Sequence, residues 1–333
     1  MMKSVVIKAD GNKVIASGHI RRCLSIAEAL KRKGTGVCFW FSDEESPEII
    51  KRFCTGDNDF PYTMEPPESK ADLLLLDSYS IRKDDFSSFR EHAAKTAYID
   101  DLCECDPDVD LLINYDPDPP ADLYHAPVQL LGTAYAPLRE QFSSCSFKVR
   151  SSANRLFISS GGTDPYRIIE KLLKELYSPN RFDPVSMLHC DVVIGAVFDE
   201  KYKSALKLLS ARYRGVMLNE GVQDMASLMN SCDLAITAGG TTLYELCAAG
   251  VPTIAFTMAD NQLEFTESFG KKGVVCYEGD ARKDALLARK LAGRAMTLLN
   301  DPGQRNSMSC GARKMVDGRG AERIADAIIR ITQ

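Results

Sequence analysis

The chain has 333 residues, of which 45% are hydrophobic, and its formal net charge is −5. This length is typical of two domains of about 150 residues each, and the hydrophobic fraction is ordinary for a globular protein. The charge gives no overall attraction to nucleic acid or to an anionic membrane, and no apolar run approaches the ~18 residues that cross a bilayer. Because the start lacks a signal-peptide pattern and the eleven cysteines are scattered, we expect a cytoplasmic protein that neither binds nucleic acid nor inserts into membranes.

Strands and helices are expected to alternate along the first half of the chain. Apolar residues between positions 20 and 30 recur at helical spacing, which predicts a helix over residues 20–33 that stops at Gly34. The predicted strands are apolar without alternation, which is typical of a parallel sheet covered on both faces. These strands are expected at residues 4–8, 37–41, 72–76, 97–99 and 110–113.

A polar, serine-rich stretch at residues 143–154 predicts a domain boundary, after which the alternation restarts. The last segment, residues 320–332, is predicted to be an amphipathic helix that crosses back to the first domain. In the second half we expect strands at 156–160, 192–197, 233–237 and 253–257, and helices at 165–177, 223–231 and 242–249.

Two such halves predict an α/β fold of two Rossmann-like domains, residues 1–150 and 151–333, whose doubly wound parallel sheets face a cleft. Ligands of such sheets bind beyond the carboxyl ends of the strands. The loops that follow the strands are therefore the candidate binding segments.

Three glycine-containing loops follow predicted strands and open helices, at residues 16–19, 161–165 and 238–242. Glycine lets the backbone approach a ligand closely, and the free amides of the following helix face an anion. No dinucleotide fingerprint or P-loop occurs. Each loop can also be a tight turn, with Asp164 as N-cap before Pro165, and with Thr242 and Glu245 as a capping box. Three loops at the expected sheet edges favour a phosphate-bearing ligand.

Taken together, these loops and several strand-end motifs resemble a known family. The chain resembles the two-domain sugar-nucleotide enzymes of the GT-B fold and, within them, the bacterial UDP-sugar hydrolases of the pseudaminic acid pathway. One departure is Ser78, where that family commonly has histidine. The matching motifs are G-H-I-x-R at 18–22, D-x-Y at 77–79, Y-I-D-D at 98–101, G-x-x-Y-A-x-L-R-x-x-F at 132–142, G-G-T-D at 161–164, A-G-G-T-T-x-x-E at 238–245, G-V-P at 250–252, and Asn261 with Gln262.

The resemblance implies a role for individual residues and implies no cofactor. His19 is expected to be the catalytic base at the anomeric carbon, with Tyr79 as a second catalytic residue that contacts the sugar. Glu245 is expected to accept hydrogen bonds from the ribose. The expected diphosphate-binding residues are Gly161, Gly162, Thr163, Gly239, Gly240, Thr241 and Thr242. The remaining substrate-binding residues are expected to be Asp10, Gly18, Arg22, Tyr135, Arg139, Asn261 and Gln262.

The position of His19 agrees with a catalytic base. A histidine at a helix N-terminus meets the positive end of the helix dipole, which disfavours imidazolium, and a neutral imidazole accepts a proton from water. The alternative is that His19 only caps the helix. The sequence places no carboxylate nucleophile beside His19, which predicts inversion at the anomeric carbon. No metal site is predicted: Cys103 and Cys105 lack a second pair, and Asp116 and Asp118 lie among prolines.

These arguments predict a metal-independent hydrolase that acts on a UDP-linked deoxy diacetamido sugar. Its products would be UDP and a free sugar for nonulosonic acid or surface polysaccharide biosynthesis. Two alternatives stay open: a GT-B glycosyltransferase that uses a UDP-amino sugar, and a non-catalytic partner that binds a nucleotide sugar.

Overall fold

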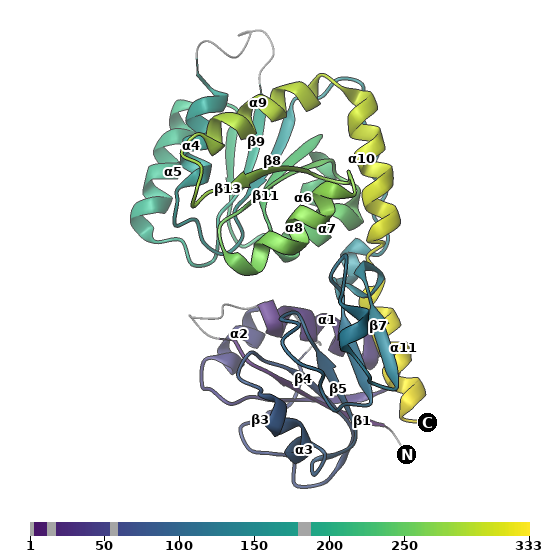
Figure 1. Ribbon diagram of the computed structural model, residues 1–333. Coiled ribbons are helices and arrows are strands. Elements are labelled where there is room, and N and C mark those ends of the chain that lie inside the picture. Colours follow the sequence, from purple (N-terminus) through teal and green to yellow (C-terminus); the bar gives the residue numbers. More distant parts are fainter. Residues whose placement is uncertain (1–2, 12–17, 54–58, 179–187) are drawn as a thin grey trace. The chain divides into compact units, whose positions relative to one another are not determined.

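The computed structural model describes residues 3–11, 18–53, 59–178 and 188–333, so residues 16 and 17 of the first glycine loop lie outside the described residues (Figure 1). The chain divides into two compact units. Unit 1 comprises Met1–Glu140 and Gly318–Gln333, and unit 2 comprises Gln141–Asp317. The sequence-based boundary at residue 150 and the assignment of the whole C-terminal part to the second domain both differ from this division.

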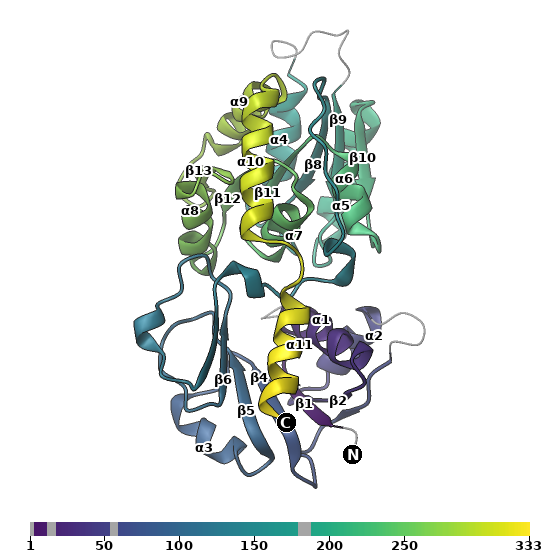
Figure 2. The ribbon, with the colours of Figure 1, turned by 90° about the vertical axis from the view of Figure 1, so that its right-hand side faces the viewer.

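The assignment of the C-terminal part differs because the C-terminal helix joins unit 1, as predicted for residues 320–332. This helix, α11 (Gly320–Ile331), packs along α1 (Gly18–Arg32). Its apolar residues Ala321, Ile324 and Ile328 belong to the same buried cluster as Ile7 and Ile26. Figure 2 shows α11 beside α1. In unit 1, α1 and α11 therefore cover one face of the sheet together, although they lie far apart in the sequence.

The sheet of unit 1 has seven parallel strands in the order β3-β2-β1-β4-β5-β6-β7. Alternate residues of the central strands face the α1 side and the α3 side, and both sides are buried. The elements are β1 (Ser4–Ala9), α1, β2 (Gly36–Trp40), α2 (Ser46–Phe53), β3 (Tyr62–Thr63), β4 (Ala71–Asp77), α3 (Phe86–Phe89), β5 (Ala93–Ile99), β6 (Leu111–Asn114), β7 (Val128–Leu131) and α11, with 3-10 turns η1 (Lys83–Asp85), η2 (Ala121–Leu123) and η3 (Thr133–Tyr135).

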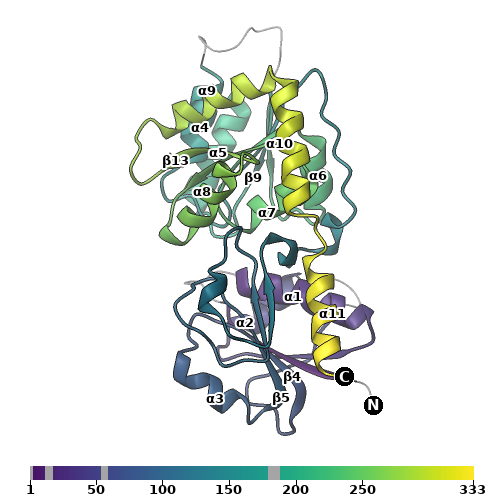
Figure 3. The ribbon, with the colours of Figure 1, turned by 45° about the vertical axis from the view of Figure 1, so that its right-hand side comes forward.

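The sheet of unit 2 has six parallel strands in the order β10-β9-β8-β11-β12-β13. One buried cluster packs α4, α5 and α9 against alternate residues of the sheet (Figure 3). The elements are η4 (Glu140–Phe142), which joins the units, β8 (Arg155–Ser159), α4 (Ile168–Leu176), β9 (His189–Val193), α5 (Glu200–Arg212), β10 (Val216–Asn219), α6 (Met225–Ser231), β11 (Leu234–Ala238), α7 (Thr241–Ala249), β12 (Thr253–Thr257), η5 (Asp260–Gln262), α8 (Leu263–Lys271), β13 (Cys276–Asp280), α9 (Leu287–Leu299) and α10 (Pro302–Met315).

In unit 2, one expected helix start is wrong and one expected helix cap is not formed. Helix α4 begins at Ile168, not at Pro165, because the Asp164 carboxylate accepts from the amides of Ile168 and Ile169 at 2.8 and 2.9 Å and so caps a later turn. Helix α7 begins after Gly240 without a side-chain cap, so the expected capping box is not formed.

The strand expected at residues 192–197 lies earlier, as β9. Its charged residue Asp191 is buried in the sheet, where it pairs with Arg155 at 2.6 Å. Because Arg155 compensates its charge, Asp191 can be buried within β9. A search for apolar runs places the strand too late, since it excludes this charged residue. Within the described ranges, no helix is both long and apolar enough to cross a membrane.

Candidate active site

His19 lies in a buried cluster at the carboxyl edge of the unit 1 sheet. It is the second residue of α1, and Asp77 is the last residue of β4. His19 Nδ1 lies 2.7 Å from Asp77 Oδ1, and both side chains are almost completely buried. An ionised carboxylate only accepts hydrogen bonds. His19 Nδ1 therefore carries the proton and donates a hydrogen bond to Asp77. The free lone pair of a neutral imidazole is then on Nε2, the atom that can act as a base.

Arg22, one turn along α1 from His19, connects this pair to the next two strands. Its guanidinium donates to both Asp77 oxygens, with Nε 2.6 Å from Oδ2. Nη1 donates to Asp101 Oδ2 at 2.7 Å and to the Tyr115 hydroxyl at 2.6 Å. With each nitrogen of the guanidinium bonded to protein atoms, Arg22 acts in unit 1 as the group that holds the cluster together.

The charges in this cluster compensate one another. Burial by itself raises the pKa of Asp77, but Arg22 and His19 beside it outweigh burial and hold that pKa well below its usual range. Burial also disfavours the Arg22 cation, yet Asp77, Tyr115 and Asp101 raise its pKa well above the usual value. Asp77 is therefore a carboxylate at neutral pH, which is the form that orients His19.

Tyr79 and Asp101 form the outer part of the cluster. The Tyr79 ring meets the His19 ring edge-on, with centroids 4.3 Å apart, and Tyr79 as a residue is 39% exposed. Its hydroxyl donates to Asp101 Oδ2 at 3.2 Å. Burial and the nearby Asp101 raise the pKa of Tyr79 to about 12, so Tyr79 is neutral near pH 7.

Asp77, Asp101 and Tyr115 belong to this cluster, but we assigned none of them a role from the sequence. Each lies at or just after the carboxyl end of a strand, and β4, β5 and β6 are neighbours in the sheet. The predicted strand ends gave a signal for all three. The missing information was that the three strands are adjacent and that Arg22 reaches them.

The other predicted substrate-binding residues of unit 1 are spread more widely. Asp10 directly follows β1, and its Oδ1 atom is buried without a hydrogen-bond partner among the described residues. Gly18 opens α1, and a Cβ placed there would contact nothing within 4 Å. Tyr135 lies in η3 against α11, and Arg139 carries its charge near Glu28 of α1. Within the described ranges, Asp10 thus offers an unused acceptor at the same sheet edge as Asp77.

In unit 2, the two predicted phosphate loops leave neighbouring strands, β8 and β11, at the same edge. Gly161 has φ of +80°, a conformation that favours glycine, and Gly162 and Thr163 are exposed. The Gly162 carbonyl accepts from the amide of Val197 at 3.1 Å, which ties this loop to the segment after β9. A Cβ on Gly162 would meet no protein atom within 4 Å, so the loop is open on that side.

The second loop of unit 2 is packed from behind by the segment that contains Asn261 and Gln262. A Cβ on Gly239 would lie 2.2 Å from Thr266 Oγ1, so only glycine fits there. Gln262 Oε1 accepts from the Met258 amide at 2.8 Å, which gives Gln262 a role in shaping this loop, while Asn261 is exposed.

Beyond the second loop, Gly240 precedes α7, which begins at Thr241 and Thr242 and buries Glu245. The first amides of such a helix have no acceptor within the helix and suit an anion.

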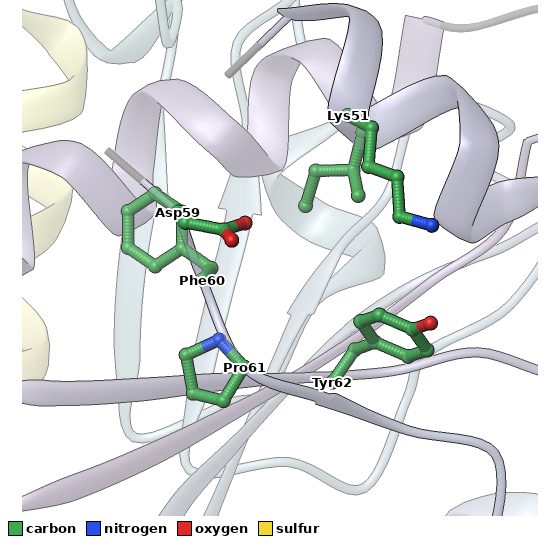
Figure 4. A pocket seen from close by; sticks show the side chains of 6 residues that line it. Lys51, Asp59, Phe60, Pro61 and Tyr62 are labelled. Atoms are coloured by element: carbon green, nitrogen blue, oxygen red, sulfur yellow. The ribbon is translucent and has the colours of Figure 1, made fainter. Parts of the chain in front are cut away.

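A separate cavity of about 380 Å³ lies between α2 and β3 (Figure 4). None of the predicted site residues lines it. Its lining residues are Ile50, Lys51, Asp59, Phe60, Pro61 and Tyr62.

No family model matches the chain. The spore coat polysaccharide biosynthesis protein SpsG of Bacillus subtilis is 24% identical over 341 residues, which cover 96% of each chain. The pseudaminic acid cytidylyltransferase and UDP-2,4-diacetamido-2,4,6-trideoxy-beta-L-altropyranose hydrolase of Helicobacter pylori is 23% identical over 267 residues, 77% of this chain and 45% of that protein. An uncharacterized protein of Methanocaldococcus jannaschii, MJ1062, is 25% identical over 297 residues, 80% of this chain and 58% of that protein. The chain therefore spans about half the length of the last two relatives.

Among solved structures, MurG of Acinetobacter baumannii aligns with a TM-score of 0.70 over 98% of this chain and 99% of that chain, at 13% identity. The chain has the GT-B fold. Its two Rossmann-like parallel sheets confirm the fold class expected from the sequence. At this identity the likeness concerns the GT-B fold and leaves the reaction to be argued from the residues.

Proposed function

We propose that this protein is a hydrolase of the pseudaminic acid type, which cleaves the anomeric C–O bond of a UDP-linked deoxy diacetamido sugar. The products are UDP and a free sugar for nonulosonic acid or surface polysaccharide biosynthesis. The observation that carries this proposal is the buried 2.7 Å bond between His19 Nδ1 and Asp77 Oδ1, which leaves Nε2 as a base. The similarity to the Helicobacter pylori hydrolase supports a UDP-sugar substrate, and the similarity to SpsG supports a role in polysaccharide biosynthesis.

In the proposed reaction, His19 Nε2 removes a proton from water as the water oxygen bonds to the anomeric carbon. The bond from that carbon to the UDP oxygen breaks, and UDP leaves with the electron pair. UDP is a good leaving group, so the reaction demands no strong general acid. Asp77 stabilises the imidazolium that forms on His19, as the aspartate does in the Asp–His pairs of serine hydrolases.

In this proposal the nucleotide is held by unit 2. The open loop at Gly162 and Thr163 and the first amides of α7 supply donors for the diphosphate. The buried Glu245 accepts from the ribose hydroxyls. Backbone donors and a helix dipole suffice to hold this charge, so we expect the reaction to need no metal ion.

Glu245→Gln should weaken UDP binding by about 1–3 kcal/mol, because the charge-assisted hydrogen bonds to the ribose are lost. Calorimetry with UDP measures this change. The exposed Glu264 of α8 provides a matched control, since Glu264→Gln removes the same charge at a surface position. Unchanged UDP affinity in Glu245→Gln would remove Glu245 from the nucleotide site.

The structure raises an alternative to inversion that the sequence did not suggest, namely retention of the anomeric configuration. The structure brings the carboxylate of Asp101 into the His19 cluster through Tyr79 and Arg22. A carboxylate there could serve as a nucleophile, which would retain the anomeric configuration. Its pairing with Arg22 and Tyr79 compensates its charge and favours single displacement by water.

The decisive experiment is an incubation with a panel of UDP-sugars in oxygen-18 water, without an acceptor. We expect UDP and free sugar in equal amounts, the label in the sugar, and the inverted anomer in proton NMR spectra taken before mutarotation. A retained anomer would implicate Asp101, and label in UDP would mean attack at phosphorus. Turnover only after an acceptor is added would identify a glycosyltransferase instead.

A further inference from the structure

Asp101 belongs to the His19 cluster but is accessible from solvent. Its side chain is 23% exposed, whereas the Arg22 side chain is 8% exposed and that of Asp77 is completely buried. Tyr79, which donates to Asp101, is also exposed. A ligand that approaches this edge of the unit 1 sheet therefore meets Tyr79 and Asp101 before the buried charges.

The bonds of Asp101 within the protein use one of its two carboxylate oxygens. Oδ2 accepts from Arg22 Nη1 at 2.7 Å and from the Tyr79 hydroxyl at 3.2 Å. Among the described residues, Oδ1 accepts no hydrogen bond. An ionised carboxylate is an acceptor only, and two bonds to Oδ2 fix its position. Within the part of the chain that the structure describes, Oδ1 is thus an unused acceptor at a fixed place in the cluster.

We infer that Asp101 Oδ1 binds the sugar ring of the substrate by accepting a hydrogen bond from an acetamido N–H or a ring hydroxyl. The inference rests on the proposed function in that the ligand is a UDP-sugar. A deoxy diacetamido sugar carries two amide N–H groups and few hydroxyls, so its donors match an acceptor-only group. Asp101 would then position the sugar beside His19 and would favour amino sugars.

The variant Asp101→Asn tests this role because of how its amide must orient. The Asn carbonyl has to face Arg22 and Tyr79, both donors, so its NH₂ group takes the place of Oδ1 and opposes the sugar donor. In a His19→Ala background, which prevents turnover, we expect a roughly 10- to 100-fold loss of affinity for UDP-N-acetylglucosamine. UDP affinity in the same protein should be unchanged. Calorimetry measures both ligands.

Glu104→Gln is the matched control, because Glu104 is exposed in the same loop and the substitution removes the same charge. UDP-glucose is the second probe: loss confined to UDP-N-acetylglucosamine identifies the acetamido N–H, and loss with both sugars identifies a ring hydroxyl. An equal loss for UDP and both UDP-sugars, or no loss for either sugar, would overturn the inference. If Asp101→Asn melts early, Asp101→Glu takes its place in the test. This variant keeps the charge toward Arg22 and should retain the fold, with a smaller loss of affinity for UDP-N-acetylglucosamine.

This comparison is independent of hydrolysis. If wild-type protein releases no free sugar from the UDP-sugar panel, the proposed function fails. The affinity difference between UDP and UDP-N-acetylglucosamine would still report on Asp101 in that case.

Discussion

His19→Ala should lower kcat for UDP-sugar hydrolysis by roughly 10²- to 10⁴-fold, the usual size of a general-base contribution. The affinity for UDP should stay the same, because the proposed nucleotide loops belong to unit 2. A steady-state assay of UDP release, combined with calorimetry of UDP binding, measures both quantities. The expected outcome is a loss of kcat without a matching loss of nucleotide affinity.

His125→Ala is a matched control for this experiment. His125 also pairs through Nδ1 with a carboxylate, Asp106, at 3.0 Å, but its side chain is 79% exposed. The control removes the same type of pair from the surface of the same unit and should leave kcat unchanged. Turnover of His19→Ala within a few-fold of wild type would refute the assignment of His19 as the base.

Asp77→Asn should reduce both activity and stability. An asparagine amide can donate to Nδ1, which favours the tautomer with the proton on Nε2, and a histidine in that tautomer cannot act as the base at Nε2. We expect kcat to fall by roughly 10²- to 10⁴-fold, as with loss of the base itself. The buried Arg22 also loses its main counter-charge, which should cost about 3–5 kcal/mol of unfolding free energy.

The stability effect of Asp77→Asn should depend on pH in a defined direction. The folded state lowers the pKa of Asp77, so the carboxylate stabilises the fold above its unfolded pKa of about 4, and this contribution is lost as pH falls toward the folded pKa. Urea unfolding of wild type and variant at several pH values should show a large difference near pH 7 that shrinks below about pH 4. Asp122→Asn, at an exposed position, is the control. A difference that does not change with pH would contradict the charge argument.

Strongly apolar strands and the helices α1, α6, α7 and α11 could be predicted from the sequence, because their patterns are local. The predicted strands at 4–8, 72–76 and 253–257 correspond to β1, β4 and β12. The edge strand β13 was not predicted, because its sequence C-Y-E-G-D is polar and only partly buried. Helix α10 was not predicted either, although Asp301 caps it at the Gln304 amide and Pro302 opens it.

The candidate site was predicted only in part, for a different reason. His19 and Tyr79 carry recognisable local motifs, but Asp77 and Tyr115 gain their roles from Arg22, which bonds to both across three strands. Contacts of this kind depend on the order of strands in the sheet, which a single sequence does not encode in any local pattern. The same limit explains why the sequence suggested no carboxylate nucleophile beside His19, whereas Asp101 lies in the same cluster.

The contribution of α11 to the core of unit 1 has a consequence for the order of folding during synthesis. Unit 2 is continuous in sequence from Gln141 to Asp317, so all of it is translated before α11. The strands of unit 1 precede unit 2, yet Ile324 and Ile328, which cover α1, are translated only after all of unit 2. Domains generally fold as units as they emerge, so the later-made unit should reach its native state first, and the earlier-made unit should wait with part of its apolar face uncovered.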